Sequence, residues 1–153
     1  GSDNENTQDH AVRALLNISS PNLDNRNAVV RPLVALLQVR NATAQMKAAQ
    51  ALVLLASRSG ADRLAIADAG AIPLLIQLLG DGRNATTPQV RSAAVLCDLA
   101  RSGENKQAIV EAGGVIPLVK MLSSSNVEAQ VNSSGALKHV AANTAAQKMI
   151  TEA

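Results

Sequence analysis

The sequence predicts an all-α fold: a right-handed α-solenoid in which each repeat contributes a short helix, a second short helix and a long helix. The main observation is a phrase that occurs twice, IADAGAIPLLIQLL at 66–79 and IVEAGGVIPLVKML at 109–122, with a constant shift of 43 residues. Parts of it recur as RPLVALL at 31–37 and MITEA at 149–153. A fixed phrase with a period of about 40 residues is typical of a repeat array. We expect about three full repeats, with partial repeats at both ends.

The composition agrees with a helical array and excludes other classes. Hydrophobic residues are 47% of the 153, and Phe, Tyr and Trp are absent, so small aliphatic side chains must form the core. The net charge is +2 and the charges are scattered, which argues against nucleic-acid binding. No apolar run reaches the roughly 20 residues that span a bilayer, so we expect no membrane partner. A single cysteine, Cys97, fits an intracellular protein of the cytoplasm, the nucleus or both.

The chain opens with a tail and one helix. The Gly1-Ser2 start is typical of a cloning scar, and we expect residues 1–7 to be a tag remnant and disordered. Apolar residues at helical spacing then predict the last helix of a partial repeat within 8–20. The turn-forming sequence Ser-Ser-Pro-Asn at 19–22 ends that helix.

The first full repeat is the least regular. A short helix at about 25–30 leads to Pro32, which suits the first turn of a second helix because proline has no N–H to leave unpaired. A capping residue within 41–43 starts a long helix at about 44–57, and Gly60 is expected in the left-handed conformation after it. The long helix should bury Ala48, Leu52, Leu55 and Ala56.

The next two repeats follow one order closely. Glycine makes the sharp corner between their short helices, with Gly70 in the left-handed conformation. The expected helices are, in order, 62–69, 71–79, a long helix from Thr87 or Pro88 to about Arg101, 104–112, 114–122 and about 127–142. The domain organisation is a single array over 8–153, divided into 8–20, 21–60, 61–103, 104–143 and 144–153, the last being the start of a further repeat.

The phrase IVEAGGVIPLVKML, followed by the serine-rich turn at 123–126, resembles the armadillo repeat, and the resemblance covers residues 8–153. It implies a concave groove lined by the third helices, where the family uses a Trp and, four residues later, an Asn to hold a peptide backbone. In this sequence the Asn position holds Asn17, Leu54, Asp98 and His139. The Trp position holds Arg13, Gln50, Ala94 and Gly135. Only Asn17 is retained, which argues against importin-like binding of basic peptides.

The function expected from this resemblance is a non-catalytic interaction scaffold that binds an extended segment of a partner protein along the groove. No cofactor and no metal site are expected. Asp98 and His139 occupy corresponding positions on adjacent third helices and form at most a salt-bridged pair, while Cys97 is expected to be a partly buried thiol. The predicted groove residues are Arg13, Asn17, Lys47, Gln50, Leu54, Arg91, Ala94, Asp98, Asn132, Gly135, Lys138 and His139.

Three alternatives remain open at this point. The segment TQDHAVRALLNIS at 7–19 resembles the third helix of repeats in plant U-box ubiquitin ligases, so the array could recruit substrates for a larger ligase. A nuclear-transport adaptor is a second alternative, which the incomplete Asn ladder disfavours. We also expect the chain to be a fragment of a longer protein, because residue 153 falls inside a recurring phrase. Truncated repeat faces would then allow self-association through the ends.

Overall fold

The computed structural model describes residues 23–80 and 85–141. This part of the chain contains eight helices and no strand. The predicted all-α fold is confirmed, whereas the helices expected within 8–20 and from residue 144 onward lie outside the described residues. The helices are α2 (Leu23–Leu36), α3 (Ala42–Arg58), α4 (Gly60–Asp68), α5 (Ala71–Leu79), α6 (Thr87–Leu99), α7 (Gly103–Glu111), α8 (Val115–Met121) and α9 (Val127–Val140).

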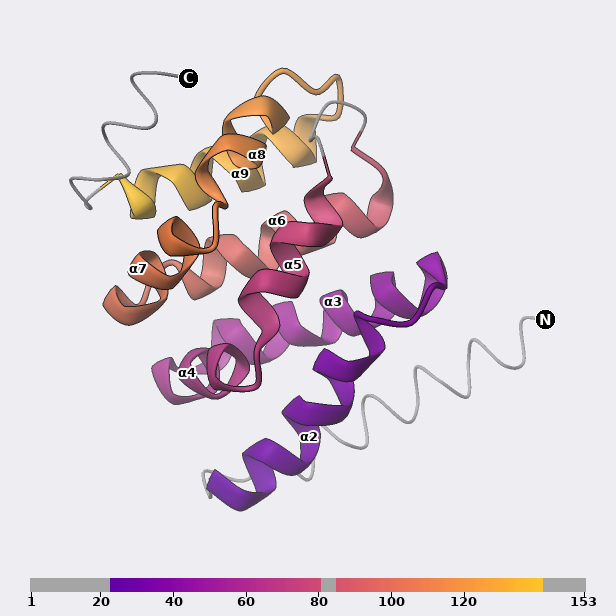
Figure 1. Cartoon of the computed structure of the whole chain (residues 1–153), viewed down its shortest axis with the longest axis vertical. Helices are drawn as coiled ribbons and strands as arrows, with labels where there is room; N and C mark the ends of the chain where they lie inside the picture. Colours follow the sequence, from indigo (N-terminus) through magenta and orange to yellow (C-terminus); the bar gives the residue numbers. More distant parts are fainter. Residues whose placement is uncertain (1–22, 81–84, 142–153) are drawn as a thin grey trace.

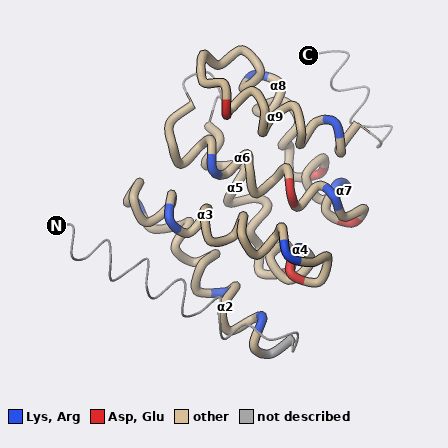
Figure 2. The backbone as a smooth tube through the Cα atoms, turned by 180° about the vertical axis from the view of Figure 1, so that it is seen from behind, with Lys and Arg blue, Asp and Glu red and all other residues tan. Residues whose placement is uncertain are grey.

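The helices form successive units that lie side by side. The long helices α3, α6 and α9 pack against one another in that order. In Figure 1 they lie behind α2, α5 and α8, and Figure 2 shows them from the other side. Helices that pack closely belong to the same unit or to neighbouring units, as a solenoid requires. We call the outer surface of α3, α6 and α9 the third-helix face.

An aliphatic core lies between the layers. The residues predicted to point inward from α3 are all buried, namely Ala48, Leu52, Leu55 and Ala56. Each later unit adds fully buried leucines, among them Leu75 on α5, Leu96 on α6 and Leu118 on α8. Burial of one leucine side chain contributes about 1.5–3 kcal/mol, so a few such residues hold adjacent units together.

Glycine makes the corners between the short helices of the second and third units, as predicted. Gly70 has φ 86° before α5, and Gly113 has φ 80° before α8. The prediction of a left-handed conformation for Gly60 is wrong, because Gly60 is the first residue of α4. Ser59 separates α3 from α4 with extended backbone, φ −159°, and its Oγ accepts a hydrogen bond from the N–H of Asp62 at 3.1 Å. A serine N-cap with extended backbone, and not a left-handed glycine, therefore separates α3 from α4.

The prediction of two short helices in the first unit is wrong, because α2 is one continuous helix with Pro32 inside it. A proline there removes a backbone hydrogen bond and costs about 3 kcal/mol. Apolar residues at helical spacing run through this position, and all of them are buried: Val29, Val30, Leu33, Val34 and Leu37. Burial of that stripe against α3 and α4 outweighs the cost of the proline.

Polar caps start the long helices. Asn41 Oδ1 accepts from the N–H of Ala44 at 3.0 Å, so the start of α3 falls within the predicted 41–43. The cap of α6 is Thr86 rather than Thr87, and its N–H donates to Gln89 Oε1 at 2.7 Å. The helix ends at Leu99, two residues earlier than expected.

None of the described helices combines the length and apolarity needed to cross a bilayer.

Candidate partner-binding face

The third helices carry ten of the twelve residues predicted to line the groove. Arg13 and Asn17 lie outside the described residues, so that part of the prediction is not tested. On α3, Lys47 is half-buried and Gln50 is exposed. Leu54 is 51% exposed, which places a large apolar side chain on the third-helix face. The others lie on α6 (Arg91, Ala94, Asp98) and on α9 (Asn132, Gly135, Lys138, His139).

Two of these residues tie α6 to α9. Arg91 Nη1 lies 2.9 Å from Glu128 Oε1, and both side chains are partly exposed. Asn132 Nδ2 donates to the carbonyl oxygen of Val90 at 3.3 Å. The Nε atom of Arg91 is buried and has no hydrogen-bond partner. Arg91 and Asn132 therefore already contribute to the packing of two neighbouring repeats, and only their remaining polar atoms are open to a partner.

Small residues occupy corresponding positions on two of the third helices. Ala94 and Gly135 occupy corresponding positions on α6 and α9, and Cys97 lies beneath Gly135. A Cβ atom on Gly135 would lie 2.7 Å from Cys97 Sγ, so the two helices approach closely here. Cys97 is a half-buried free thiol, as predicted. Burial and then the charge of Asp98 raise the pKa of this thiol, which keeps it protonated and a poor nucleophile.

Asp98 and His139 lie near each other toward the C-terminal ends of α6 and α9. Each affects the pKa of the other, but the two side chains, both described here, form no ion pair within 4.0 Å. Burial raises the pKa of Asp98, against the opposing charges of Arg101, Arg63 and His139. Burial also lowers the pKa of His139, and three cations lower it further, namely Lys106, Lys138 and Arg101.

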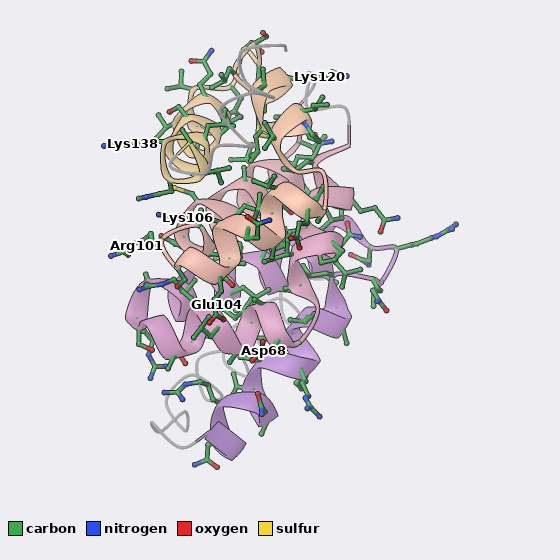
Figure 3. The ribbon with its side chains drawn as sticks, turned by 60° about the vertical axis from the view of Figure 1, so that its left-hand side comes forward. Asp68, Arg101, Glu104, Lys106, Lys120 and Lys138 are labelled. Carbon is green, nitrogen blue, oxygen red and sulfur yellow. The ribbon has the colours of Figure 1, made fainter. Side chains whose placement is uncertain are left out.

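Two of these cations were not predicted as groove residues. Arg101 lies one helical turn after Asp98, and that spacing is a signal that could have placed it on the same side. Lys106 belongs to α7, the first helix of the third unit, and only the packing of α7 against α6 and α9 brings it here. Figure 3 shows Arg101 just after α6, Lys106 of α7 and Lys138 of α9 projecting toward the same side of the molecule.

One hollow among the described residues lies on the side of the short helices α4, α5 and α7. A cavity of about 540 Å³ lies between the corner of α4 and α5 and the neighbouring α7, and its acidic lining residues are Asp68, Glu104 and Glu111. Figure 3 shows Asp68 and Glu104 from α4 and α7 on this part of the surface. Within the described ranges, no three His, Cys, Asp or Glu side chains gather in a way that could hold a metal ion.

Comparisons with known proteins agree with this geometry. Residues 104–142, which include α8, α9 and all of α7 but its first residue, match the Armadillo/beta-catenin-like repeat. An engineered protein solved by a structural genomics consortium is 36% identical and superposes with a TM-score of 0.78, over 93% of this chain and 60% of that one. The chain has the fold of armadillo-repeat proteins, and residues 104–142 match the armadillo repeat itself. The predicted resemblance is confirmed.

Designed armadillo repeat proteins share the fold. One, computationally designed for modular peptide recognition, is 26% identical with a TM-score of 0.78, over 97% of this chain and 64% of that one. Another, in complex with the peptide (KR)4, is 24% identical with a TM-score of 0.78, over 94% and 62%. This armadillo chain thus spans 60 to 64% of the length of these three structures. A comparison with curated proteins finds no match.

Proposed function

We propose that this armadillo array is a non-catalytic scaffold that binds an extended segment of a partner protein along the third-helix face. The observation that supports it most is the form of the face. Three third helices of successive units pack side by side, and small residues, Ala94 and Gly135, occupy corresponding positions on two of them. A segment crossing the face would find space over these small residues for its own side chains, beside the row formed by Leu54, Asp98 and His139.

Two further points favour this function. A neighbour that is 26% identical was designed for modular peptide recognition, so the same architecture is suited to peptides. A rigid extended surface also loses little conformational entropy on binding. We assign no reaction to the face, because burial raises the pKa of the Cys97 thiol and, among the described residues, neither Asp98 nor His139 forms a hydrogen bond to a hydroxyl or thiol nucleophile.

The experiment uses two exposed apolar residues of nearly equal exposure. Leu54 lies on the third-helix face and is 51% exposed, whereas Ile116 lies on α8 in the other layer and is 52% exposed. Binders are selected from a library of displayed random peptides, and their dissociation constants are measured against the native chain, Leu54→Glu and Ile116→Glu. Thermal unfolding followed by circular dichroism checks that both variants fold.

We expect Leu54→Glu to weaken most selected peptides by about tenfold or more, because it places a charge where an apolar contact forms. Ile116→Glu should leave their affinities unchanged. Peptides that respond to Ile116→Glu and ignore Leu54→Glu would place the binding surface on the other layer and overturn the proposal. So would a selection that yields no peptide sensitive to Leu54→Glu.

A further inference from the structure

Three cations from three helices gather at one end of the third-helix face. Arg101 follows the last turn of α6, Lys106 lies on α7 and Lys138 lies in the last turn of α9. Arg101 and Lys138 are exposed, and Lys106 is half-buried. Figure 3 shows all three side chains extending toward the same side. We call these three residues the basic end.

The charges of the basic end are close enough to act on one side chain. Each of the three lowers the pKa of the same imidazole, that of His139, so all three lie within electrostatic range of one side chain. Among the described residues, Asp98 is the acid whose charge acts on His139 in the opposite direction. At His139 the charge of one carboxylate thus opposes the charges of three cations, and this carboxylate is itself half-buried. The basic end therefore has a net positive charge.

The acidic residues that form ion pairs in this part of the chain do so elsewhere. Asp62 pairs with Arg26 and lies near Arg58, and Glu128 pairs with Arg91. Within the residues that the structure describes, no carboxylate lies within 4.0 Å of the cationic groups of the basic end. Three like charges gathered near a single half-buried carboxylate, Asp98, repel one another, and an anion from another molecule would relieve that repulsion.

Helix dipoles account for only part of this arrangement. Cations near the C-terminal ends of α6 and α9 are stabilised by the negative end of the helix, which explains Arg101 and Lys138 one at a time. Lys106 lies in the first half of α7, near the positive end, where a cation gains nothing from the dipole. The convergence of all three therefore has no purely local explanation.

We propose that the basic end binds a carboxylate-rich segment of the partner, with Asp and Glu side chains of that segment paired to Arg101, Lys106 and Lys138. This inference rests on the proposed function and adds the chemistry of the partner. Charge complementarity steers such a segment to the face and selects against basic segments, which like charges would repel. A role as an adaptor for basic transport signals is disfavoured for the same reason.

The test uses the whole chain and three fluorescein-labelled octapeptides: one of alternating Asp and Glu, one of alternating Gly and Ser, and one of alternating Lys and Arg. Fluorescence anisotropy gives the dissociation constants at low and at physiological salt. The variants are Lys138→Glu and Lys120→Glu. Both lysines are exposed, and each lies in the last turn of its helix, so the two variants carry the same charge change at matched positions. Figure 3 shows Lys120 away from the basic end.

We expect the acidic peptide to bind, to bind less tightly as salt is added, and to bind about fivefold less tightly to Lys138→Glu. Lys120→Glu should leave its affinity unchanged, and the neutral and basic peptides should bind more weakly than the acidic one. Equal weakening by both variants would show attraction to overall charge and would overturn the inference. So would absence of binding by the acidic peptide.

Failure of this inference is distinguishable from failure of the proposed function. If the neutral or basic peptide binds as tightly as the acidic one, the basic end does not select carboxylates, but peptides sensitive to Leu54→Glu would still support binding along the third-helix face. If no library peptide responds to Leu54→Glu while the acidic peptide responds to Lys138→Glu, the basic end is an independent anionic-peptide site and the proposed function is wrong.

Discussion

Cys97 Sγ on α6 lies 2.7 Å from the point where a Cβ atom on Gly135 of α9 would sit. Such an approach is shorter than ordinary van der Waals contact, so α9 can pack this closely on α6 only because residue 135 has no side chain. A glycine within a helix otherwise costs roughly 0.5–1 kcal/mol relative to alanine. The packing of the two third helices therefore depends on a residue that is locally unfavourable.

The first prediction tests this contact with a double-mutant cycle. Gly135→Ala in the native background should lower the free energy of unfolding, because the half-buried sulfur atom must move. In a Cys97→Ala background the same substitution should raise it by roughly 0.5–1 kcal/mol, since the helix gains alanine and nothing opposes the new methyl group. Urea denaturation of the four proteins measures the difference. Equal effects in both backgrounds would show that the two residues do not touch.

A buried ion pair joins the first unit to the second. Asp62 is 3% exposed, and its Oδ1 accepts from Arg26 Nε at 2.7 Å while its Oδ2 accepts from Ser59 Oγ at 3.0 Å. Asp62→Ala would leave the Arg26 charge largely buried without its partner, so we expect a loss of about 3 kcal/mol in unfolding free energy. Asp68→Ala on the exposed side of the same helix should change it by less than about 0.5 kcal/mol. Similar losses for both variants would contradict a structural role for the pair.

The corner before α5 requires a left-handed residue. Gly70 has φ 86°, and a Cβ added there would meet nothing within 4 Å, so any cost of a side chain comes from the backbone alone. We expect Gly70→Ala to lower the unfolding free energy by about 1–2 kcal/mol. Gly103 also has open space but ordinary φ at the start of α7, and Gly103→Ala should be neutral or slightly stabilising. Denaturant unfolding measures the free energy of unfolding of both variants. Equal effects would contradict the requirement for a left-handed residue at position 70.

The pH dependence of stability should include a contribution from His139. Burial and three nearby cations lower the pKa of its imidazole below the ordinary 6.5. The unfolded chain therefore binds more protons than the folded chain as the pH falls through this range, and the contribution of His139 to stability falls with it. We expect the melting temperature of His139→Gln, measured relative to the native chain, to rise between neutral pH and about pH 5. Parallel curves for the two proteins would contradict the lowered pKa.

The features of the fold that could be predicted from the sequence are those that depend on one residue or one short pattern. A positive φ requires glycine, so Gly70 could be assigned from the repeated phrase. The inward residues of α3 follow from helical periodicity. The continuity of α2 could not be predicted in this way, because the local preference of Pro32 was overruled by burial of an apolar stripe that depends on the neighbouring helices.

The same distinction applies to the residues of the candidate site. The position of Leu54 on the third-helix face follows from alignment of the repeats, since equivalent residues of stacked units share a surface. The basic end could not be predicted, because Lys106 is far from the third helices in the repeat pattern and reaches them only through packing of α7. The pairing of Arg91 with Glu128 likewise joins residues 37 positions apart. Both depend on how one unit rests on the next.

Helix packing in this molecule is confined to neighbouring units, and that has a consequence for the order in which structure is lost. Amide protons of α6, which packs against α3, α5 and α9, should exchange with deuterium more slowly than those of α2 and α8, which pack against fewer of the described helices. Local opening would begin with helices that pack against fewer of the described helices and would advance unit by unit. A bound segment that crosses α3, α6 and α9 would then act as a brace across several units and slow their exchange together.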